Sequence, residues 1–90
     1  MVKKVYSIRD NKMESYGQLV FIDNDAVASR MFGDLVLNDR DSLIGKHPAD
    51  FGIYCLGEFD DKTGRFENVE AARLVAIGSD FLNRKETKNV

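Results

Sequence analysis

Three carboxylates lie within four positions in the segment "LGEFDDKTGRF": Glu58, Asp60 and Asp61. Clustered acids can bind a cation or exchange a proton in catalysis. Their spacing does not fit a helix-loop-helix calcium loop, where the ligands alternate with other residues and a glutamate stands at position 12. A tight reverse turn fits better, because Asp and Thr bond to nearby backbone and Gly64 can adopt a positive φ. We therefore predict a structural turn built by Asp60, Asp61 and Gly64, and no metal site.

The only cysteine and the only histidine lack the neighbours that chemistry would require. Cys55 stands among apolar residues, with no adjacent base to favour its thiolate, so we expect it in the core. His47 precedes the only proline, and no second His or Cys stands at the spacing of a metal ligand. Gly45 and Lys46 lack the rest of a phosphate-binding loop. We therefore expect no enzyme and no cofactor.

Aromatic and basic residues offer a physical route to nucleic acid. Aromatic rings on a sheet can stack on unpaired bases while basic side chains hold the backbone, at about 1–3 kcal/mol per stacked base. The rings on predicted strands are Tyr6, Phe21, Tyr54 and Phe66, and the alternative is that most of them fill the core. The predicted nucleic-acid-binding residues are Lys3, Lys4, Tyr6, Arg9, Lys12, Tyr54 and Arg65.

The first half of the chain predicts an antiparallel hairpin followed by a helix. Residues 3–10 and 16–22 are rich in β-branched and aromatic residues, as strands are. Residues 25–38 repeat apolar residues at helical spacing, with Asp23 or Asn24 as the N-terminal cap. The stripe expected to face the core consists of Val27, Ala28, Met31, Phe32, Leu35 and Val36. The residues expected to face water are Ser29, Arg30, Gly33 and Asp34, with Gly33 either tolerated there or marking a close approach.

The second half predicts a long loop, two strands and a second helix. The loop covers 38–52, with one helical turn starting at Pro48. In the strand that follows, alternation places Phe59 on the same face as Cys55. The remaining elements are a strand over 51–59, a strand over 65–69, a helix over 69–77 ended by Gly78 as a left-handed cap, and a flexible polar tail over 83–90.

The predicted fold is α+β, with a small antiparallel sheet, the order ββαββα, and one amphipathic helix packed on one face. The 90 residues are 43% hydrophobic and 31% charged, which is typical of a single globular domain over 1–90. The apolar runs are too short to span a membrane, and no secretory signal opens the chain. One cysteine suits a reducing compartment. We therefore expect an intracellular protein, in bacterial or host cytoplasm.

The net charge of −2 hides an asymmetry between the body of the chain and its ends. Residues 5–82 carry 8 basic and 14 acidic side chains, a net charge of −6, and the two ends together carry +4. An acidic body does not attract phosphate, so any binding of nucleic acid should be local.

The run "HPADFGIYCLGEFDDKTGRFE" resembles the small nonstructural protein of gokushoviruses, tailless single-stranded DNA phages related to the chlamydia phages. The resemblance includes "VYSIRDNK", "DAVASRMFGDLV", "KHPADF" and "GSDF", and covers about residues 3–82. In related phages this protein is described as DNA-binding, or is likened to the packaging-switch protein that moves replication from duplex copies to single strands. The resemblance implies the same role here, and no catalytic residues.

Two functions are therefore expected. The first is a non-enzymatic phage accessory protein that binds single-stranded DNA or the replication complex during replication and packaging. The alternative, favoured by the acidic body, is a protein-interaction module that acts on the replication initiator, capsid precursor or a host factor without DNA contact. We also expect a homodimer, because a small sheet with exposed edges gains burial by pairing.

Overall fold

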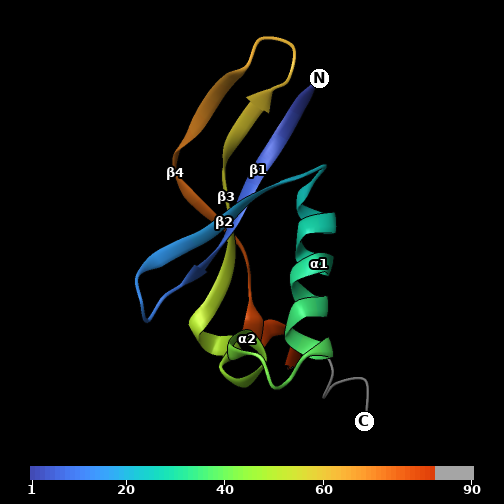
Figure 1. Ribbon diagram of the computed structural model, residues 1–90, viewed down its shortest axis with the longest axis vertical. Helices are drawn as coiled ribbons and strands as arrows, with labels where there is room; N and C mark the ends of the chain where they lie inside the picture. The colour runs from blue at the N-terminus through green and yellow to red at the C-terminus, as the bar shows by residue number, and fades with distance from the viewer. Residues whose placement is uncertain (83–90) are drawn as a thin grey trace.

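The computed structural model describes residues 1–82, without the side chains of 68–70, as an antiparallel four-stranded sheet with helices (Figure 1). The strand order is β2-β1-β3-β4. The strands are β1 (Val2–Asp10), β2 (Ser15–Ile22), β3 (Phe51–Asp60) and β4 (Arg65–Ile77). The predicted α+β class with a small antiparallel sheet is confirmed.

The first hairpin forms where the sequence predicts it. Tyr6 pairs with Val20, and the register shifts between Ser7 and Arg9. The Ser7 hydroxyl is buried and donates a hydrogen bond to the Gly17 carbonyl at 3.1 Å, so the irregular stretch leaves this polar group satisfied.

Helix α1 (Asp25–Asn38) has the bounds predicted from its apolar spacing. The Asn24 side chain accepts a hydrogen bond from the Val27 N–H at 2.9 Å, so Asn24 is the N-terminal cap. The predicted core stripe is only partly correct, because Leu35 is 44% exposed. The buried positions are Ala28, Phe32, Gly33 and Val36.

Gly33 does not face water. It is buried, and the ring of Phe81 lies against it: a Cβ built on Gly33 would lie 2.6 Å from Phe81 Cε1. The same ring packs edge-on against Phe32, with 5.9 Å between the ring centroids. Gly33 therefore marks the close approach that was one of the two sequence-based interpretations.

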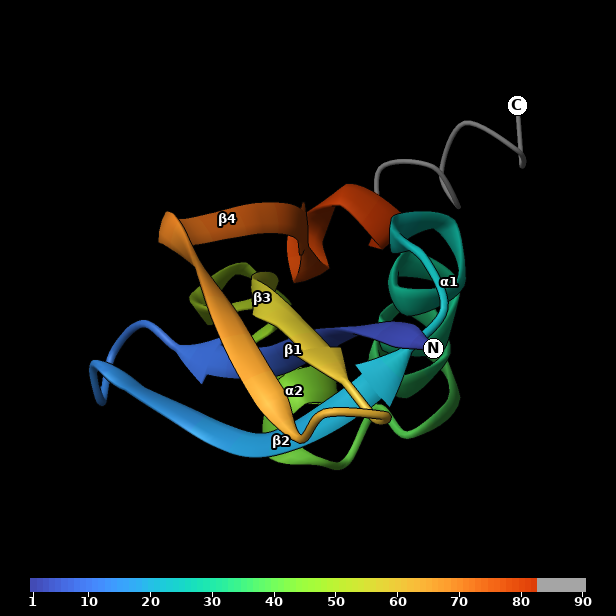
Figure 2. The same ribbon diagram turned by 90° about the horizontal axis from the view of Figure 1, so that it is seen from above.

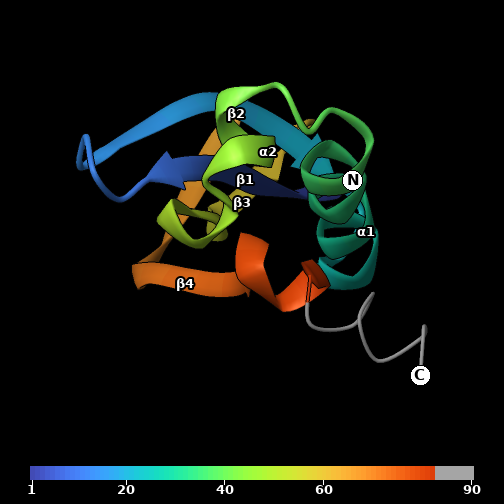
Figure 3. The same ribbon diagram turned by 90° about the horizontal axis from the view of Figure 1, so that it is seen from below.

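Two short helices lie between α1 and β3: α2 (Leu43–Lys46) and η1 (Pro48–Asp50). The predicted helical turn at Pro48 is confirmed by η1. The Ser42 hydroxyl caps α2 by accepting a hydrogen bond from the Gly45 N–H at 3.0 Å. Figure 3 shows α2 at the end of the molecule where the helical residues 78–82 also lie.

The prediction of a helix over 69–77 is wrong, and the order ββαββα is not confirmed. These residues continue β4, in which Ala76 pairs with Ile53 and Leu74 with Tyr54. The pairing overrides helix propensity, because without β4 the outer edge of β3 would lack backbone partners. Gly78 starts the next helical residues and does not have the positive φ of a left-handed cap.

One core lies between α1 and the sheet (Figures 1 and 2). Cys55 is buried there, as predicted. Within residues 1–82 no helix is long and apolar enough to cross a membrane, and the tail predicted at 83–90 lies outside the described residues. The core residues are Tyr6, Ala28, Phe32, Val36, Phe51, Ile53, Cys55, Ala76 and Phe81.

Candidate functional site

The sheet has one face packed against α1 and one face turned away from it, which we call the open face. Side chains alternate along each strand, so the neighbours of the core residues Tyr6, Ile53 and Cys55 project to the open face. Several of these neighbours are large, apolar and exposed. The open face consists of Lys3, Val5, Ser7, Arg9, Tyr16, Leu19, Phe21, Tyr54, Leu56, Phe59, Phe66 and Leu74.

A bulge in β3 decides which aromatic residues reach the open face. Cys55 pairs with Tyr6 but Gly57 pairs with Val5, so Leu56 is the extra residue. The extra residue reverses the alternation along β3. Phe59 therefore lies on the open face, and its predicted position on the same face as Cys55 is wrong.

A first cluster on the open face combines arginine with two tyrosines. The Arg9 guanidinium carbon lies 5.6 Å from the centroid of the Tyr16 ring. The rings of Tyr16 and Tyr54 meet edge to face, with 5.7 Å between their centroids. Arg9 donates to the Asn11 side-chain oxygen at 2.6 Å and forms no ion pair with a described residue. Its positive charge therefore remains available to an anionic ligand.

A second cluster on the open face consists of three phenylalanines. The ring centroids of Phe21 and Phe59 are 5.5 Å apart, and those of Phe59 and Phe66 are 4.7 Å apart. Phe21 is 50% exposed and Phe66 is 57% exposed. Exposed aromatic residues that adjoin one another, rather than standing singly, indicate an interaction site.

An apolar hollow of about 140 Å³ lies on the open face, lined by Val5, Leu19, Leu56, Gly57 and Phe66. Leu19 belongs to β2 and Phe66 to β4, with two strands between them. Because both side chains line one hollow, the open face is concave. The two aromatic clusters and the hollow together form a shallow, largely apolar trough.

Comparison with known proteins identifies the protein family to which the chain belongs. The model of the family described as "Phage ORF5 protein" matches residues 3–81. The chain belongs to the Phage ORF5 family. "Protein ORF5" of Chlamydia phage 1 is 36% identical over 83 residues, which cover 87% of this chain and 86% of that protein. The predicted resemblance to chlamydia-phage-like microvirus proteins is thereby confirmed. No solved structure gives a significant match.

Only some of the predicted nucleic-acid-binding residues of this ORF5-family protein lie together on the open face. Arg9, Tyr54 and Lys3 lie on the open face. Tyr6 is fully buried, and its hydroxyl donates to an Asp25 carboxylate oxygen at 2.7 Å, so it is not part of this surface. Lys4 pairs with Ile22 and Glu58 and alternates to the side of α1.

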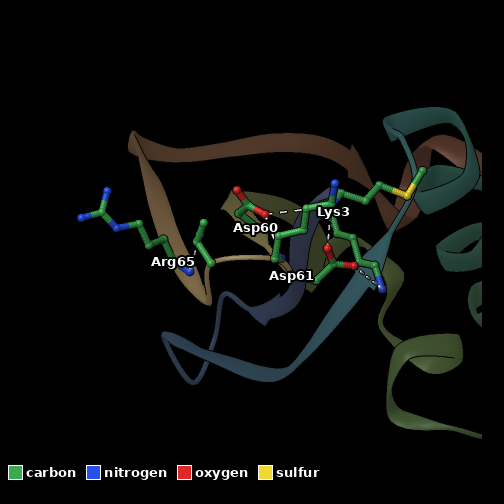
Figure 4. Close-up of polar contacts among 7 residues, drawn as sticks. Lys3, Asp60, Asp61 and Arg65 are labelled. Carbon is green, nitrogen blue, oxygen red and sulfur yellow. Dashed lines mark hydrogen bonds and ion pairs between the residues drawn. The ribbon is translucent and has the colours of Figure 1, made fainter.

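Lys12 and Arg65 lie apart from the open face. Lys12 is in the turn between β1 and β2, where its N–H donates to the Asp10 carboxylate at 3.0 Å. Arg65 starts β4 opposite Asp60, and its side chain points away from the neighbouring acids in Figure 4.

The predicted turn closes the hairpin of β3 and β4. The Gly64 N–H donates to the Asp60 carbonyl at 2.8 Å, and Gly64 has a φ of 75°. The Lys3 ammonium lies 3.7 Å from an Asp61 carboxylate oxygen (Figure 4). A hydrogen bond from the amino group of Met1 holds the pKa of Asp61 below its ordinary value. No group of three or more metal-ligating side chains occurs among the described residues.

The sequence alone does not single out the surface residues Tyr16, Leu19, Leu56 and Leu74. The available signal was in β2, where the run "LVFI" places apolar side chains on both faces of one strand. That pattern is typical of a strand covered on both sides. On the side of β2 that faces away from α1, the only cover comes from the neighbouring aromatic rings and leucines of the open face.

Proposed function

We propose that this chain is a non-enzymatic phage accessory protein that binds single-stranded DNA through the open face, in the cytoplasm of the bacterial host. The observation that supports the proposal is the cluster of Arg9, Tyr16 and Tyr54 on an exposed, concave sheet surface. Unpaired bases stack on aromatic rings, and arginine contributes both a phosphate contact and stacking.

Stacking rather than charge would dominate this binding. Among the open-face residues only Lys3 and Arg9 are basic, and Lys3 already has Asp61 beside it. Each phosphate contact adds about −0.7 to the slope of log K against log salt for a single strand. Two contacts therefore predict a slope of about −1.4, which is shallow for a DNA-binding protein.

The length of the trough predicts a short site. Tyr54 and Phe59 mark the two aromatic clusters on β3 and are five residues apart. At about 3.3 Å per residue the clusters lie roughly 15 Å from each other along the strand. This distance accommodates a few nucleotides. Duplex DNA should bind weakly, because its bases are already stacked.

Fluorescence anisotropy tests the proposal. Labelled single-stranded and duplex oligonucleotides of equal length would be titrated with the protein at low and moderate salt. We expect Tyr16→Ala to weaken single-strand binding about 5- to 150-fold, which corresponds to the loss of one stacked base. Leu43→Ala is the matched control, because Leu43 is 62% exposed but belongs to α2.

Two results would overturn the proposal. One is no binding of single strands even at low salt, where phosphate contacts are strongest. The other is equal weakening by Tyr16→Ala and Leu43→Ala, since only the first residue lies on the open face.

The apolar hollow supports a second candidate function, a protein-interaction module. Its lining of Leu19, Leu56 and Phe66 suits an apolar side chain of a partner better than a phosphate. The partners proposed for this function are the replication initiator, the capsid precursor or a host factor, without DNA contact. A nuclease-treated pull-down from infected cells would recover such a partner with the wild type and lose it with Leu56→Asp. A parallel pull-down without nuclease that recovered DNA but no protein partner would contradict this function.

A further inference from the structure

The two edges of the sheet differ in chemistry. The edge strand β4 carries the charged residues Arg65, Glu67 and Arg73, and its pairing with β3 shifts register at two places. Charges and bulges on an edge strand hinder its pairing with another strand. The β4 edge is therefore protected against association.

The other edge strand, β2, has no such protection. Its eight residues, "SYGQLVFI", include no charged residue and no proline. Its one register shift lies near the hairpin turn, and residues 19–22 pair regularly with β1. Leu19 and Phe21 are each 50% exposed beside this edge. The outward N–H and C=O groups of 19–22 can thus accept another strand.

We propose that β2 pairs antiparallel with β2 of a second copy of this chain, which joins two four-stranded sheets into one continuous sheet. The strand order β2-β1-β3-β4 puts β2 at the edge of the sheet opposite to β4. The inference does not depend on DNA binding.

The absence of charge argues for a second copy as the partner. A two-fold axis between two β2 strands places residues near the axis opposite the same segment of the other copy. Any charge there would face a like charge, which destabilises a cross-strand pair. β2 contains none. Pairing also places Leu19 and Phe21 beside their counterparts, and so removes apolar surface of the open face from water.

Sedimentation or light scattering of the full chain without DNA tests the proposal. We expect a mass twice the 10.2 kDa of one chain at micromolar concentration, and dissociation on dilution. Leu19→Lys should raise the dimer dissociation constant at least tenfold. Phe66→Lys is the matched control, because Phe66 is 57% exposed on the same face but belongs to the β4 edge, so it should leave the dimer intact. Circular dichroism checks that both variants fold.

Hydrogen exchange locates the interface directly. The amides among residues 19–22 that point away from β1 should exchange more slowly as the protein concentration rises, while those of β4 should not change. A mass of one chain at all concentrations would overturn the proposal. Equal dissociation by Leu19→Lys and Phe66→Lys would also overturn it, since that result indicates association through the open face rather than the β2 edge.

Discussion

Asp25 and Arg73 are 48 residues apart in the chain, yet the Asp25 carboxylate accepts hydrogen bonds from both terminal nitrogens of Arg73, at 2.7 and 3.2 Å. The buried Tyr6 hydroxyl donates to the same carboxylate at 2.7 Å. One side chain in the first turn of α1 is therefore tied to both β1 and β4. These contacts are polar, and they fix the helix against the sheet at the edge of the apolar core.

Removal of Arg73 should destabilise the fold near neutral pH but not in strong acid. The hydrogen bonds from Arg73, followed by that from Tyr6, lower the pKa of Asp25 to about 2. Because this pKa lies below the unfolded value, the stabilisation is complete above about pH 5 and disappears as the pH falls toward 2. Asp25 is 40% exposed, so we expect Arg73→Gln to cost only about 0.5–1 kcal/mol at pH 7.

Urea unfolding at pH 7, 4 and 2.5 measures this difference. Arg30→Gln is the control, because Arg30 is exposed on α1 and forms no ion pair with a described residue. If Arg73→Gln lowered the free energy of unfolding by the same amount at pH 7 and at pH 2.5, Arg73 would act by packing rather than by its charge.

Tyr6→Phe should remove an alkaline transition. Burial of the phenol, together with its hydrogen bond to Asp25, raises the pKa of Tyr6 above its ordinary value. The folded pKa is the higher one, so this stabilisation is complete below about pH 10 and is lost as the pH rises further. The free energy of unfolding of this variant at pH 7 should be about 1.5 kcal/mol lower than that of the wild type, because the hydrogen bond is missing.

Unfolding free energies between pH 7 and pH 11 test this expectation. The wild type should lose stability above pH 10 more steeply than Tyr6→Phe, while Tyr54→Phe, on the open face, serves as the control. Identical alkaline slopes for wild type and Tyr6→Phe would contradict it.

Gly33→Ala should destabilise the protein although alanine favours helices by about 1 kcal/mol. The added methyl group would overlap the Phe81 ring, whose atoms lie 2.6 and 2.7 Å from the Cβ position. Overpacking of this kind costs about 1–3 kcal/mol, so a net loss is expected. Chemical denaturation of Gly33→Ala alone and in a Phe81→Leu background separates the two effects. The substitution should be harmless or stabilising in the second background, and stabilisation in both would show that the ring moves aside freely.

Gly64→Ala should cost about 1 kcal/mol or more, because alanine disfavours a positive φ. No atom lies within 4 Å of the added Cβ, so the cost is one of backbone conformation alone. In thermal melts the melting temperature should fall by about 4–8 °C for each kcal/mol of lost stability in a chain of this size. Gly64→Asn is the control, since asparagine tolerates this conformation.

Asp61→Asn and added calcium should both leave the melting temperature nearly unchanged. Asp61 contacts Lys3 and Met1 at the exposed tip of the hairpin, and exposed pairs contribute little. A rise of several degrees with calcium, abolished by Asp61→Asn, would show that the acidic turn binds metal.

Arg9→Gln should reduce the salt dependence of single-strand binding. One lost phosphate contact lowers the magnitude of the slope by about 0.7. Anisotropy titrations at several salt concentrations measure the slope, and Lys12→Gln, in the β1–β2 turn, provides a control. An unchanged slope of log K against log salt would show that Arg9 does not contact a phosphate.

Local rules were sufficient for several elements of this fold. The bounds of α1, a cap at Asp23 or Asn24, the first hairpin, the helical turn at Pro48 and the positive φ of Gly64 all depend on residues a few positions apart. Apolar spacing, side-chain capping and the conformational freedom of glycine act within that range, so the amino-acid order alone predicts them.

The side chains exposed on the open face depend on contacts between distant segments. Residues 69–77 have helix-forming character but become a strand because β3 offers them backbone hydrogen bonds. The bulge at Leu56 arises in pairing with β1, and it moves Phe59 from the core side to the open face. Tyr6 and Tyr16 are both tyrosines on strands of the same hairpin. Tyr6 is buried because α1 packs over its face of the sheet, and Tyr16 is exposed because it lies on the other face. Strand pairing and helix docking therefore decide which rings are exposed, and no local pattern encodes them.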